Sequence, residues 1–355
     1  MDSNISNNMS NNMSNNNTCE LIDYSKYIKN LVSKLDTKYL DLDMIVSPGG
    51  FNIFYAFGVC DFLLECERQK KLKVHRIHGA SAGSVVGLLY LIQSSSDFFM
   101  KHYEELRNHF DKYKNASVFF QHVDEYFDKY ITDEKILDSI NNRLFIGYHE
   151  IKNDSVFCEY KIDSLYKTLN DLRKKIKASC AVPVYTVESC FYACEEYNYL
   201  DGFYTQNFPI INPQRHTLHV NLVSPFDSST IMIPYKSTCN SLYLEGINDL
   251  FEMLQKKQPT FRLDLTNNFT DPYPHLTFKN IVWRNLLYTI ITVYIFCVKT
   301  VRKIKQFLID WSSIHIPAFL NTSFKLNFAA VMKKINDESY YSYYRMIYNF
   351  VKMFV

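Results

Sequence analysis

The sequence predicts an α/β fold, and two successive patterns point to it. Residues 43–47 form a short apolar run that ends at Pro48 and two glycines, and residues 54–67 follow with helical length and an apolar stripe. The pattern then repeats, because residues 74–81 read as a second strand and residues 82–93 as a small, apolar helix. Two strand-turn-helix units in succession favour a right-handed arrangement around a parallel sheet.

The rest of the predicted sheet lies further along the chain. Residues 97–144 alternate polar and apolar positions at helical spacing and include pairs of phenylalanines, so we expect a helical insertion, with a lipid-facing lid as the alternative. Segments rich in β-branched and aromatic residues predict further strands at 151–162, 184–199, 216–223 and 229–235, with a helix at 164–178.

The composition is that of a globular protein. With 47% hydrophobic residues, a chain of 355 residues can bury a full-sized core. Basic and acidic residues nearly balance, at 39 and 37, so no nucleic-acid partner is expected. The nine cysteines have no regular spacing, which argues against a disulfide framework and favours a reducing, intracellular compartment.

The two ends of the chain differ from its middle. Residues 1–18 are almost entirely Asn, Ser and Met, and predict a disordered tail and not a signal peptide. Beyond residue 236 the chain becomes aromatic and helical. There, residues 286–298 are uncharged and precede several basic residues. A spanning helix needs about 20 apolar residues, so this run predicts either a core helix or an anchor that tilts into or lies on a membrane.

The placement of the glycines indicates where the functional site lies. The chain has only nine, and a short span holds six of them: Gly49, Gly50, Gly58, Gly79, Gly83 and Gly87. A seventh, Gly202, follows Asp201. Glycine permits backbone conformations and close approaches that other residues do not. We therefore expect the chain to fold tightly around a site at these positions.

The strongest single motif is Gly79-Ala80-Ser81-Ala82-Gly83, between a predicted strand and a predicted helix. A nucleophile elbow requires this context, because its turn is too tight for side chains on either side of the serine. The unpaired amides at the start of the helix also favour negative charge near the serine. A tight turn whose serine only caps the helix is the structural alternative.

A nucleophilic serine needs a base. The usual base is a histidine later in the chain, but no candidate lies in a recognisable signature: His216, His219, His275 and His315. The carboxylate that stands out is Asp201, which ends a strand-like stretch and precedes a scarce glycine. Its alternative interpretation is an ordinary Asp-Gly turn.

Taken together, four ordered motifs resemble those of the patatin-like phospholipase family, over roughly residues 42–212. They are SPGGF at 47–51, HGASAG at 78–83, ASCAVP at 178–183, and Asp201-Gly202, after which Asn207 and Pro209 also fit. The resemblance implies a three-layer α/β fold with a central, mostly parallel sheet, followed by a helical, aromatic-rich C-terminal region. Together with the composition of the two ends, it suggests a disordered tail (1–18), a patatin-like catalytic domain (40–235) and a helical C-terminal region (236–355), which the run at 286–298 predicts to associate with a membrane.

The resemblance also implies a lipid acyl hydrolase with a Ser-Asp dyad and no histidine. Ser81 would be the nucleophile and Asp201 its base, acting through an acyl-enzyme on a phospholipid or another acyl lipid, at a membrane surface. The amides of Gly49 and Gly50 would form the oxyanion hole, and no metal or organic cofactor is required. Because a solvated carboxylate is a poor base, we expect the site to be partly desolvated.

The glycine loop departs from the family's pattern. Members commonly have three glycines, a basic residue and another glycine, whereas here Pro48 stands first, Asn52 replaces the basic residue and Ile53 the later glycine. Proline has no amide hydrogen to donate. Gly49 and Gly50 still can donate, but the missing basic residue calls the rigidity of the loop and a headgroup contact into question.

Two other functions remain open at this point. One is an α/β-hydrolase esterase in which Ser81 works with a later histidine. The other is a catalytically inactive patatin-like scaffold that binds lipid or protein. Separately, two basic clusters, at 70–76 and 173–177, are either solvated faces or contacts for anionic headgroups.

Overall fold

The computed structural model describes residues 24–36, 39–94, 96–113, 115–152, 159–182, 185–187, 192–194, 196–202, 215–222, 238–260 and 262–266. All of them belong to one compact unit. The predictions for residues 1–18, 229–235 and 286–298 lie outside the described residues.

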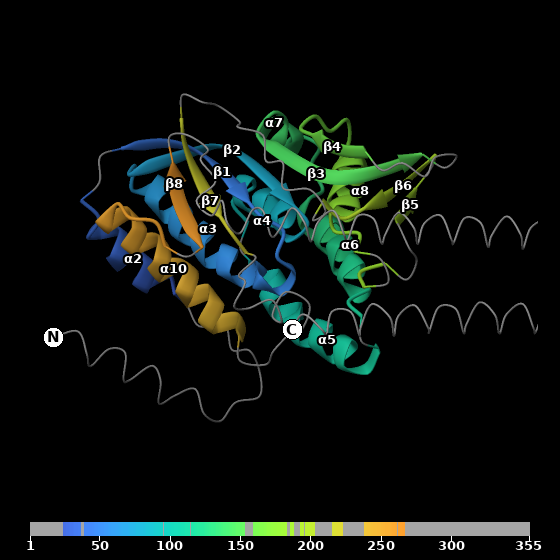
Figure 1. Cartoon of the computed structure of the whole chain (residues 1–355), viewed down its shortest axis with the longest axis horizontal. Coiled ribbons are helices and arrows are strands. Elements are labelled where there is room, and N and C mark those ends of the chain that lie inside the picture. Colours follow the sequence, from blue (N-terminus) through green and yellow to red (C-terminus); the bar gives the residue numbers. More distant parts are fainter. Residues whose placement is uncertain are drawn as a thin grey trace, which may run out of the picture. The chain divides into compact units, whose positions relative to one another are not determined.

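Four parallel strands form the centre of the sheet, in the order β7-β1-β2-β3 (Figure 1). They are β1 (Leu40–Val46), β2 (Leu72–Ala80), β3 (Leu144–Lys152) and β7 (His216–Val220). Burial follows the sequence pattern, because the last five residues of β1 are all buried, as expected for a strand covered on both faces. The predicted α/β fold with a parallel central sheet is confirmed.

Antiparallel strands complete the sheet on both sides. On one side, β8 (Leu263–Thr266) pairs with β7. On the other, β4 (Glu159–Asp163) and β6 (Tyr197–Leu200) both pair with β3. β5 (Tyr192–Cys194) pairs with β6. The sequence did not predict β8, which lies in the part of the chain expected to be helical. The strand predicted at 151–162 is also wrong as one element, since β3 begins at Leu144 and ends at Lys152.

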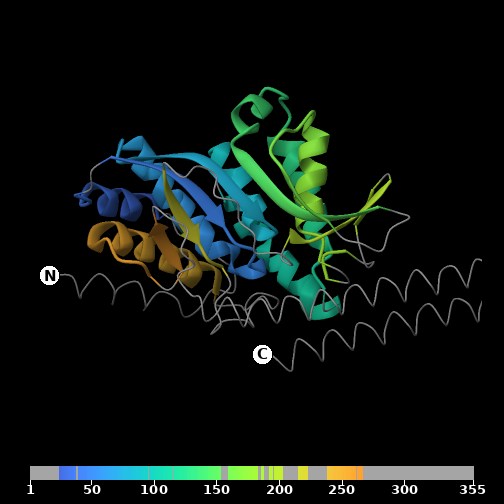
Figure 2. The same cartoon turned by 45° about the horizontal axis from the view of Figure 1, so that its top comes forward.

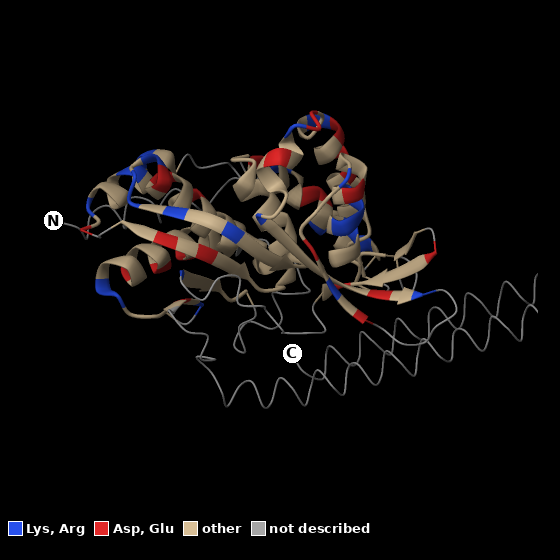
Figure 3. Cartoon of the chain, turned by 90° about the horizontal axis from the view of Figure 1, so that it is seen from above, with Lys and Arg blue, Asp and Glu red and all other residues tan. Residues whose placement is uncertain are grey.

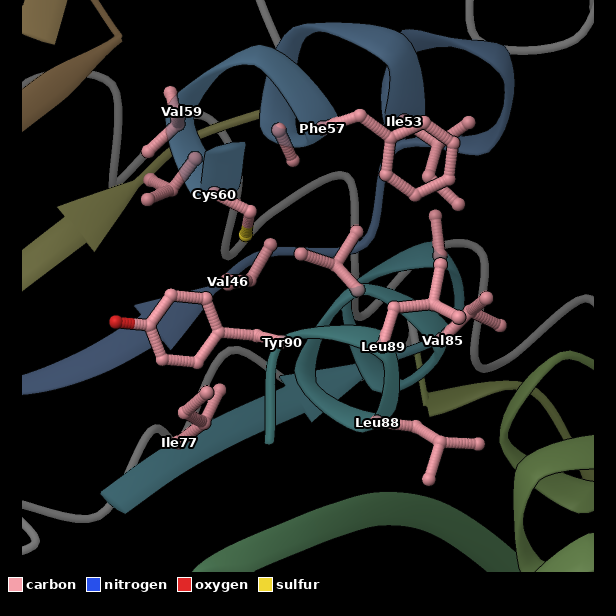
Figure 4. Packing of buried hydrophobic residues seen from close by; sticks show 14 of the residues in the cluster. Val46, Ile53, Phe57, Val59, Cys60, Ile77, Val85, Leu88, Leu89 and Tyr90 are labelled. Carbon is pink, nitrogen blue, oxygen red and sulfur yellow. The ribbon is translucent and has the colours of Figure 1, made fainter. Parts of the chain in front are cut away.

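Two buried helices connect the parallel strands. α3 (Ile53–Arg68) lies between β1 and β2 in the chain, and α4 (Ala82–Leu91) between β2 and β3. The chain moves across the sheet in one direction, from β1 to β2 to β3. Right-handed crossovers in one direction place their helices on the same face, so α3 and α4 cover the same side of the sheet (Figure 2). Their facing side chains interdigitate above Val46 (Figure 4). Every residue of α4 is buried, in agreement with its uniformly apolar sequence.

A second helix layer packs on α3. α10 (Thr238–Lys256) runs along α3, with α2 (Ser25–Ser33) beside them. The backbones of α3 and α10 approach closely at two glycines: a Cβ added to Gly58 would overlap the Tyr243 carbonyl, and one added to Gly246 would overlap the Tyr55 carbonyl. Residues beyond the expected boundary at 235 therefore pack directly on the first helix of the α/β unit.

The predicted helical insertion is present, as α5 (Asp97–Tyr113), α6 (Val118–Tyr130) and α7 (Ile136–Ile140). α8 (Leu169–Ser179) begins five residues later than predicted, because Thr168 accepts a hydrogen bond from the Asp171 amide and so caps the helix. Within the described residues, none of the helices combines the length and apolar character needed to cross a bilayer.

Candidate active site

Ser81 lies in a strained turn between β2 and α4. Its φ of 52° and ψ of −128° belong to a region that residues with a side chain rarely adopt. The turn requires both flanking glycines: a Cβ added to Gly79 would overlap the Gly83 carbonyl, and one added to Gly83 would overlap the Val46 carbonyl. The sequence motif is therefore a nucleophile elbow in its geometry.

Hydrogen bonds hold both backbone groups of Ser81. Its amide donates to the Ser179 hydroxyl at 2.8 Å, and that hydroxyl donates to the Gly147 carbonyl at 2.6 Å. Its carbonyl accepts from the amide and the hydroxyl of Ser84, at 2.9 and 2.7 Å. Such surrounding contacts are what allow a strained backbone conformation to persist.

Asp201 follows β6 directly and is fully buried. The side chain at this position is therefore removed from water. Its backbone is also fixed, because its amide donates to the Ala181 carbonyl at 3.0 Å and its carbonyl accepts from His149 Nδ1 at 2.9 Å. Burial and then the charge of Asp201 raise the pKa of the neighbouring Cys180 thiol.

One edge of β3 brings the strands before Ser81 and Asp201 together. β4 pairs with residues 146–150 of β3, which leaves the opposite edge to both β2 and β6. β2 runs parallel to β3 and ends with Ala80 opposite Gly147, whereas β6 runs antiparallel and ends with Leu200 opposite His149. The two strands therefore run toward each other and stop two β3 residues apart.

The residues that follow these strand ends consequently emerge side by side. A Cβ added to Gly202, which follows Asp201, would lie 2.8 Å from the Cβ of Ala80, which precedes Ser81. It would also overlap the Gly147 carbonyl. Close packing against the elbow therefore requires a glycine at position 202, whether or not the Asp-Gly pair also forms a turn.

The segment at 178–182 connects the two motifs. Ser179, the last residue of α8, binds the Ser81 amide, and Ala181, two residues later, binds the Asp201 amide, so this short segment holds both backbones. The sequence identified this segment by its resemblance, but not the role of Ser179. Pro183 lies outside the described residues, as do Asn207 and Pro209.

The glycine loop leaves β1 beside the elbow, since Val46 pairs with Gly79. Gly50 has a φ of 51°, in the left-handed region that favours glycine, and it begins a short 3₁₀ helix, η1 (Gly50–Asn52). Among the described residues, none accepts a hydrogen bond from the amide of Gly49 or Gly50.

Asn52 holds this loop in place of the missing basic residue. Its side chain is fully buried and donates to the Leu222 carbonyl at 2.8 Å. The same carbonyl accepts from Arg262 at 3.3 Å, and the buried Arg262 guanidinium lies 5.2 Å from the centre of the Tyr55 ring. Leu222 in turn packs against Gly49, where a Cβ would overlap it. The loop is thus tied to the end of β7, and no sequence signal indicated Arg262.

The structure describes two of the four histidines considered as alternative bases. His216 pairs with Leu42, four residues before the end of β7, which is about 13 Å along the strand. His219 lies in the same strand opposite Ile45, while His275 and His315 lie outside the described residues. The sequence did not identify His149, whose pKa is lowered by burial and whose ring contacts the Asp201 carbonyl.

The basic cluster at 173–177 forms ion pairs within the protein. Lys177 contacts Asp124 on α6 at 2.8 Å, and Arg173 contacts Asp128 on the same helix at 2.5 Å. Basic and acidic residues are accordingly intermixed over these helices (Figure 3). The interpretation as a solvated, paired face is favoured over a headgroup patch.

The family model of the patatin-like phospholipases matches residues 44–212. This range holds the glycine loop, the elbow and the Asp-Gly pair. Comparison with curated proteins finds no match. The family consists of lipid acyl hydrolases, and the observed fold agrees with it, with parallel central strands flanked by helices. Residues 44–212 therefore match the patatin-like phospholipase family in both sequence and fold.

Proposed function

We propose that this protein hydrolyses acyl ester bonds of lipids, as a phospholipase of A type, with Ser81 as the nucleophile and Asp201 as its base. One observation carries the proposal: β2 and β6 end opposite two β3 residues, Gly147 and His149, that are two positions apart, so that Ser81 and Asp201 emerge next to each other. The strained backbone of Ser81 and the burial of Asp201 support the same assignment.

In the first half of the reaction, the Asp201 carboxylate takes the proton of the Ser81 hydroxyl as its oxygen attacks the ester carbonyl carbon. The negative charge that develops on the carbonyl oxygen accepts hydrogen bonds from the amides of Gly49 and Gly50. The tetrahedral intermediate then collapses. The lipid alcohol leaves with the proton from Asp201, and the acyl group remains on Ser81.

In the second half, Asp201 takes a proton from water as the water oxygen attacks the acyl-enzyme. Collapse of this intermediate releases the fatty acid, and the proton returns to Ser81. The Ser81 amide is bound to Ser179, so it is not available to the oxyanion, and this role falls to the glycine loop. Each donor of this kind contributes on the order of a hundredfold or more in rate.

A fluorophosphonate probe, which labels activated serines, tests the proposal directly. We expect wild-type protein to be labelled, and Ser81→Ala and Asp201→Asn to lose labelling while remaining folded by circular dichroism. Ser139→Ala and Asp138→Asn on α7 are matched controls that should label like wild type. A folded wild type that is not labelled would instead favour the inactive lipid-binding or protein-binding scaffold.

The esterase alternative predicts that one histidine acts as the base. Replacing that histidine would reduce labelling on the order of a thousandfold or more. We expect each of the five single variants to label within about tenfold of wild type: His149→Gln, His216→Gln, His219→Gln, His275→Gln and His315→Gln. His149 is the most stringent of these, because its ring already contacts the Asp201 backbone.

We further propose that the C-terminal region, 236–355, holds the protein at a membrane surface. Support comes from the uncharged run at 286–298, its basic flank and the lipid substrates of the family. The test is flotation of full-length protein with anionic phospholipid vesicles. We expect Ile291→Asp combined with Phe296→Asp to abolish binding, and Ser313→Asp to leave it unchanged. Equal flotation of all three proteins would exclude this segment as the anchor.

A further inference from the structure

Helices α5 and α6 carry the same pattern, His-x-x-Glu, on sides that face each other. On α5 it is His102 and Glu105, and on α6 it is His122 and Glu125. Residues three apart lie on one face of a helix, so each pattern places its two side chains together. Helical packing then brings the two histidine rings to 4.8 Å between centroids.

Three of these side chains converge on one point. One atom each from His102, His122 and Glu125 lies within 4.8 Å of the other two. Glu125 Oε2 is 3.8 Å from His102 Nε2 and 3.8 Å from His122 Nδ1. A tetrahedral zinc ion with bonds of about 2.0–2.2 Å separates its ligand atoms by roughly 3.3–3.5 Å. Because His122 is buried, rotations of the partly exposed His102 ring and of the exposed Glu125 carboxylate would close this difference.

The hydrogen bond of His102 prepares it as a ligand. Its Nδ1 lies 2.7 Å from the Phe98 carbonyl, and since a carbonyl only accepts, Nδ1 carries the proton. If Nδ1 carries the only ring hydrogen, the Nε2 lone pair lies on the side of the Glu125 carboxylate. Two acceptors facing each other at 3.8 Å are not a hydrogen bond, and a cation between them would satisfy both.

His122 supplies a second, independent observation. The residue is only 2% exposed, and neither ring nitrogen is within hydrogen-bonding distance of a partner among the described residues: Glu125 Oε2 is 3.8 Å from Nδ1. Burying a polar ring without such partners is unfavourable. A metal on Nδ1 would satisfy that atom. His122 Nε2 would then carry the hydrogen, and its nearest carboxylate oxygen is Glu105 Oε2 at 3.9 Å. Glu105 would be the outer carboxylate that commonly orients a metal-bound histidine.

We propose that His102, His122 and Glu125 form a zinc site that joins α5 to α6, with Glu105 as the positioning residue of His122. Two imidazoles and one carboxylate suit Zn²⁺, whereas Ca²⁺ and Mg²⁺ prefer oxygen ligands alone. Glu125 is 60% exposed, so solvent reaches the site and water can complete the coordination. The site is separate from the proposed catalytic residues and does not depend on their assignment.

The site would stabilise the helical insertion where it meets the α/β unit. Phe98, one turn before His102, packs on the His102 ring and on Tyr126. α6 is in turn joined to α8 by the ion pairs of Arg173 and Lys177. A metal that joins α5 to α6 therefore restrains α5 through α6 against α8.

Metal content of the full-length protein tests the proposal. After incubation with Zn²⁺ and removal of free ion by gel filtration, we expect about one zinc per chain by elemental mass spectrometry. His102→Gln and Glu125→Gln should lose it, and His109→Gln, on the same helix but outside the cluster, should retain it. Glu105→Gln should weaken binding by roughly 10–100-fold. Zn²⁺, but not Mg²⁺, should raise the melting temperature of wild type and not of Glu125→Gln.

Two results would overturn the proposal. If wild type retains no zinc, the cluster is an ion-pair group only. If wild type, His102→Gln and Glu125→Gln retain zinc equally, the ion binds elsewhere, for which the nine cysteines are the evident ligands. Because Glu125 is exposed, Glu125→Gln tests the site without removing a buried side chain.

Discussion

Replacing Ser179 by alanine should destabilise the protein by about 2–4 kcal/mol through the elbow. The Ser179 hydroxyl is fully buried and makes two hydrogen bonds, from the Ser81 amide and to the Gly147 carbonyl. A buried amide left without an acceptor costs about 1–3 kcal/mol, and loss of the hydrogen bond to Gly147 adds about 1 kcal/mol. Relaxation of the strained Ser81 backbone would then move its hydroxyl away from its reactive position.

Ser84→Ala is the matched control, because Ser84 is equally buried and also binds the Ser81 backbone. Here the Ser81 carbonyl keeps its hydrogen bond from the Ser84 amide, so the expected loss is only about 1 kcal/mol. Urea unfolding measures both free energies, and the rate of fluorophosphonate labelling reports the position of Ser81. Labelling should fall at least tenfold in Ser179→Ala alone. Equal losses in the two variants would refute the reasoning.

Three further substitutions, at Asp61, Gly202 and Asn52, have testable effects on stability or labelling. Burial raises the pKa of Asp61 to about 6 from 3.8, and the folded state therefore binds its proton more tightly than the unfolded state. This stabilisation by the bound proton is complete below pH 4 and is lost as the pH rises to 6. Asp61→Asn should therefore stabilise the protein by about 2–3 kcal/mol at pH 8 but little at pH 3.5. An equal gain in the free energy of unfolding at the two pH values, measured in urea, would contradict this prediction. Gly202→Ala should reduce labelling on the order of a hundredfold, because its Cβ separates Asp201 from the elbow; unchanged labelling would show that the strand ends can move apart without effect. Asn52→Leu removes the hydrogen bond to Leu222, so it should lower the free energy of unfolding by about 1–2 kcal/mol and, by loosening the glycine loop, slow labelling about tenfold. A loss of stability with unchanged labelling would show that Asn52 has no part in catalysis.

Much of the local structure could be predicted from the sequence. The two strand-turn-helix units are present near their predicted bounds, because their apolar patterns and breaks are properties of neighbouring residues. The start of α8 was missed, although Thr168 and Asp171 form a recognisable cap. The strand at Leu263–Thr266 was also missed, since four residues carry little periodicity and its pairing with β7 spans about forty residues of sequence.

The candidate residues of the site could be named from local motifs alone. The turn at Ser81 has no room for side chains at Gly79 and Gly83. Because this requirement involves only neighbouring residues, it can be recognised as a sequence motif. That Ser81 and Asp201, 120 residues apart in sequence, emerge next to each other became apparent only from the folded chain. The physical reason is non-local strand pairing: β2 and β6 share one edge of β3 from opposite directions, and no pattern within either strand encodes that partner.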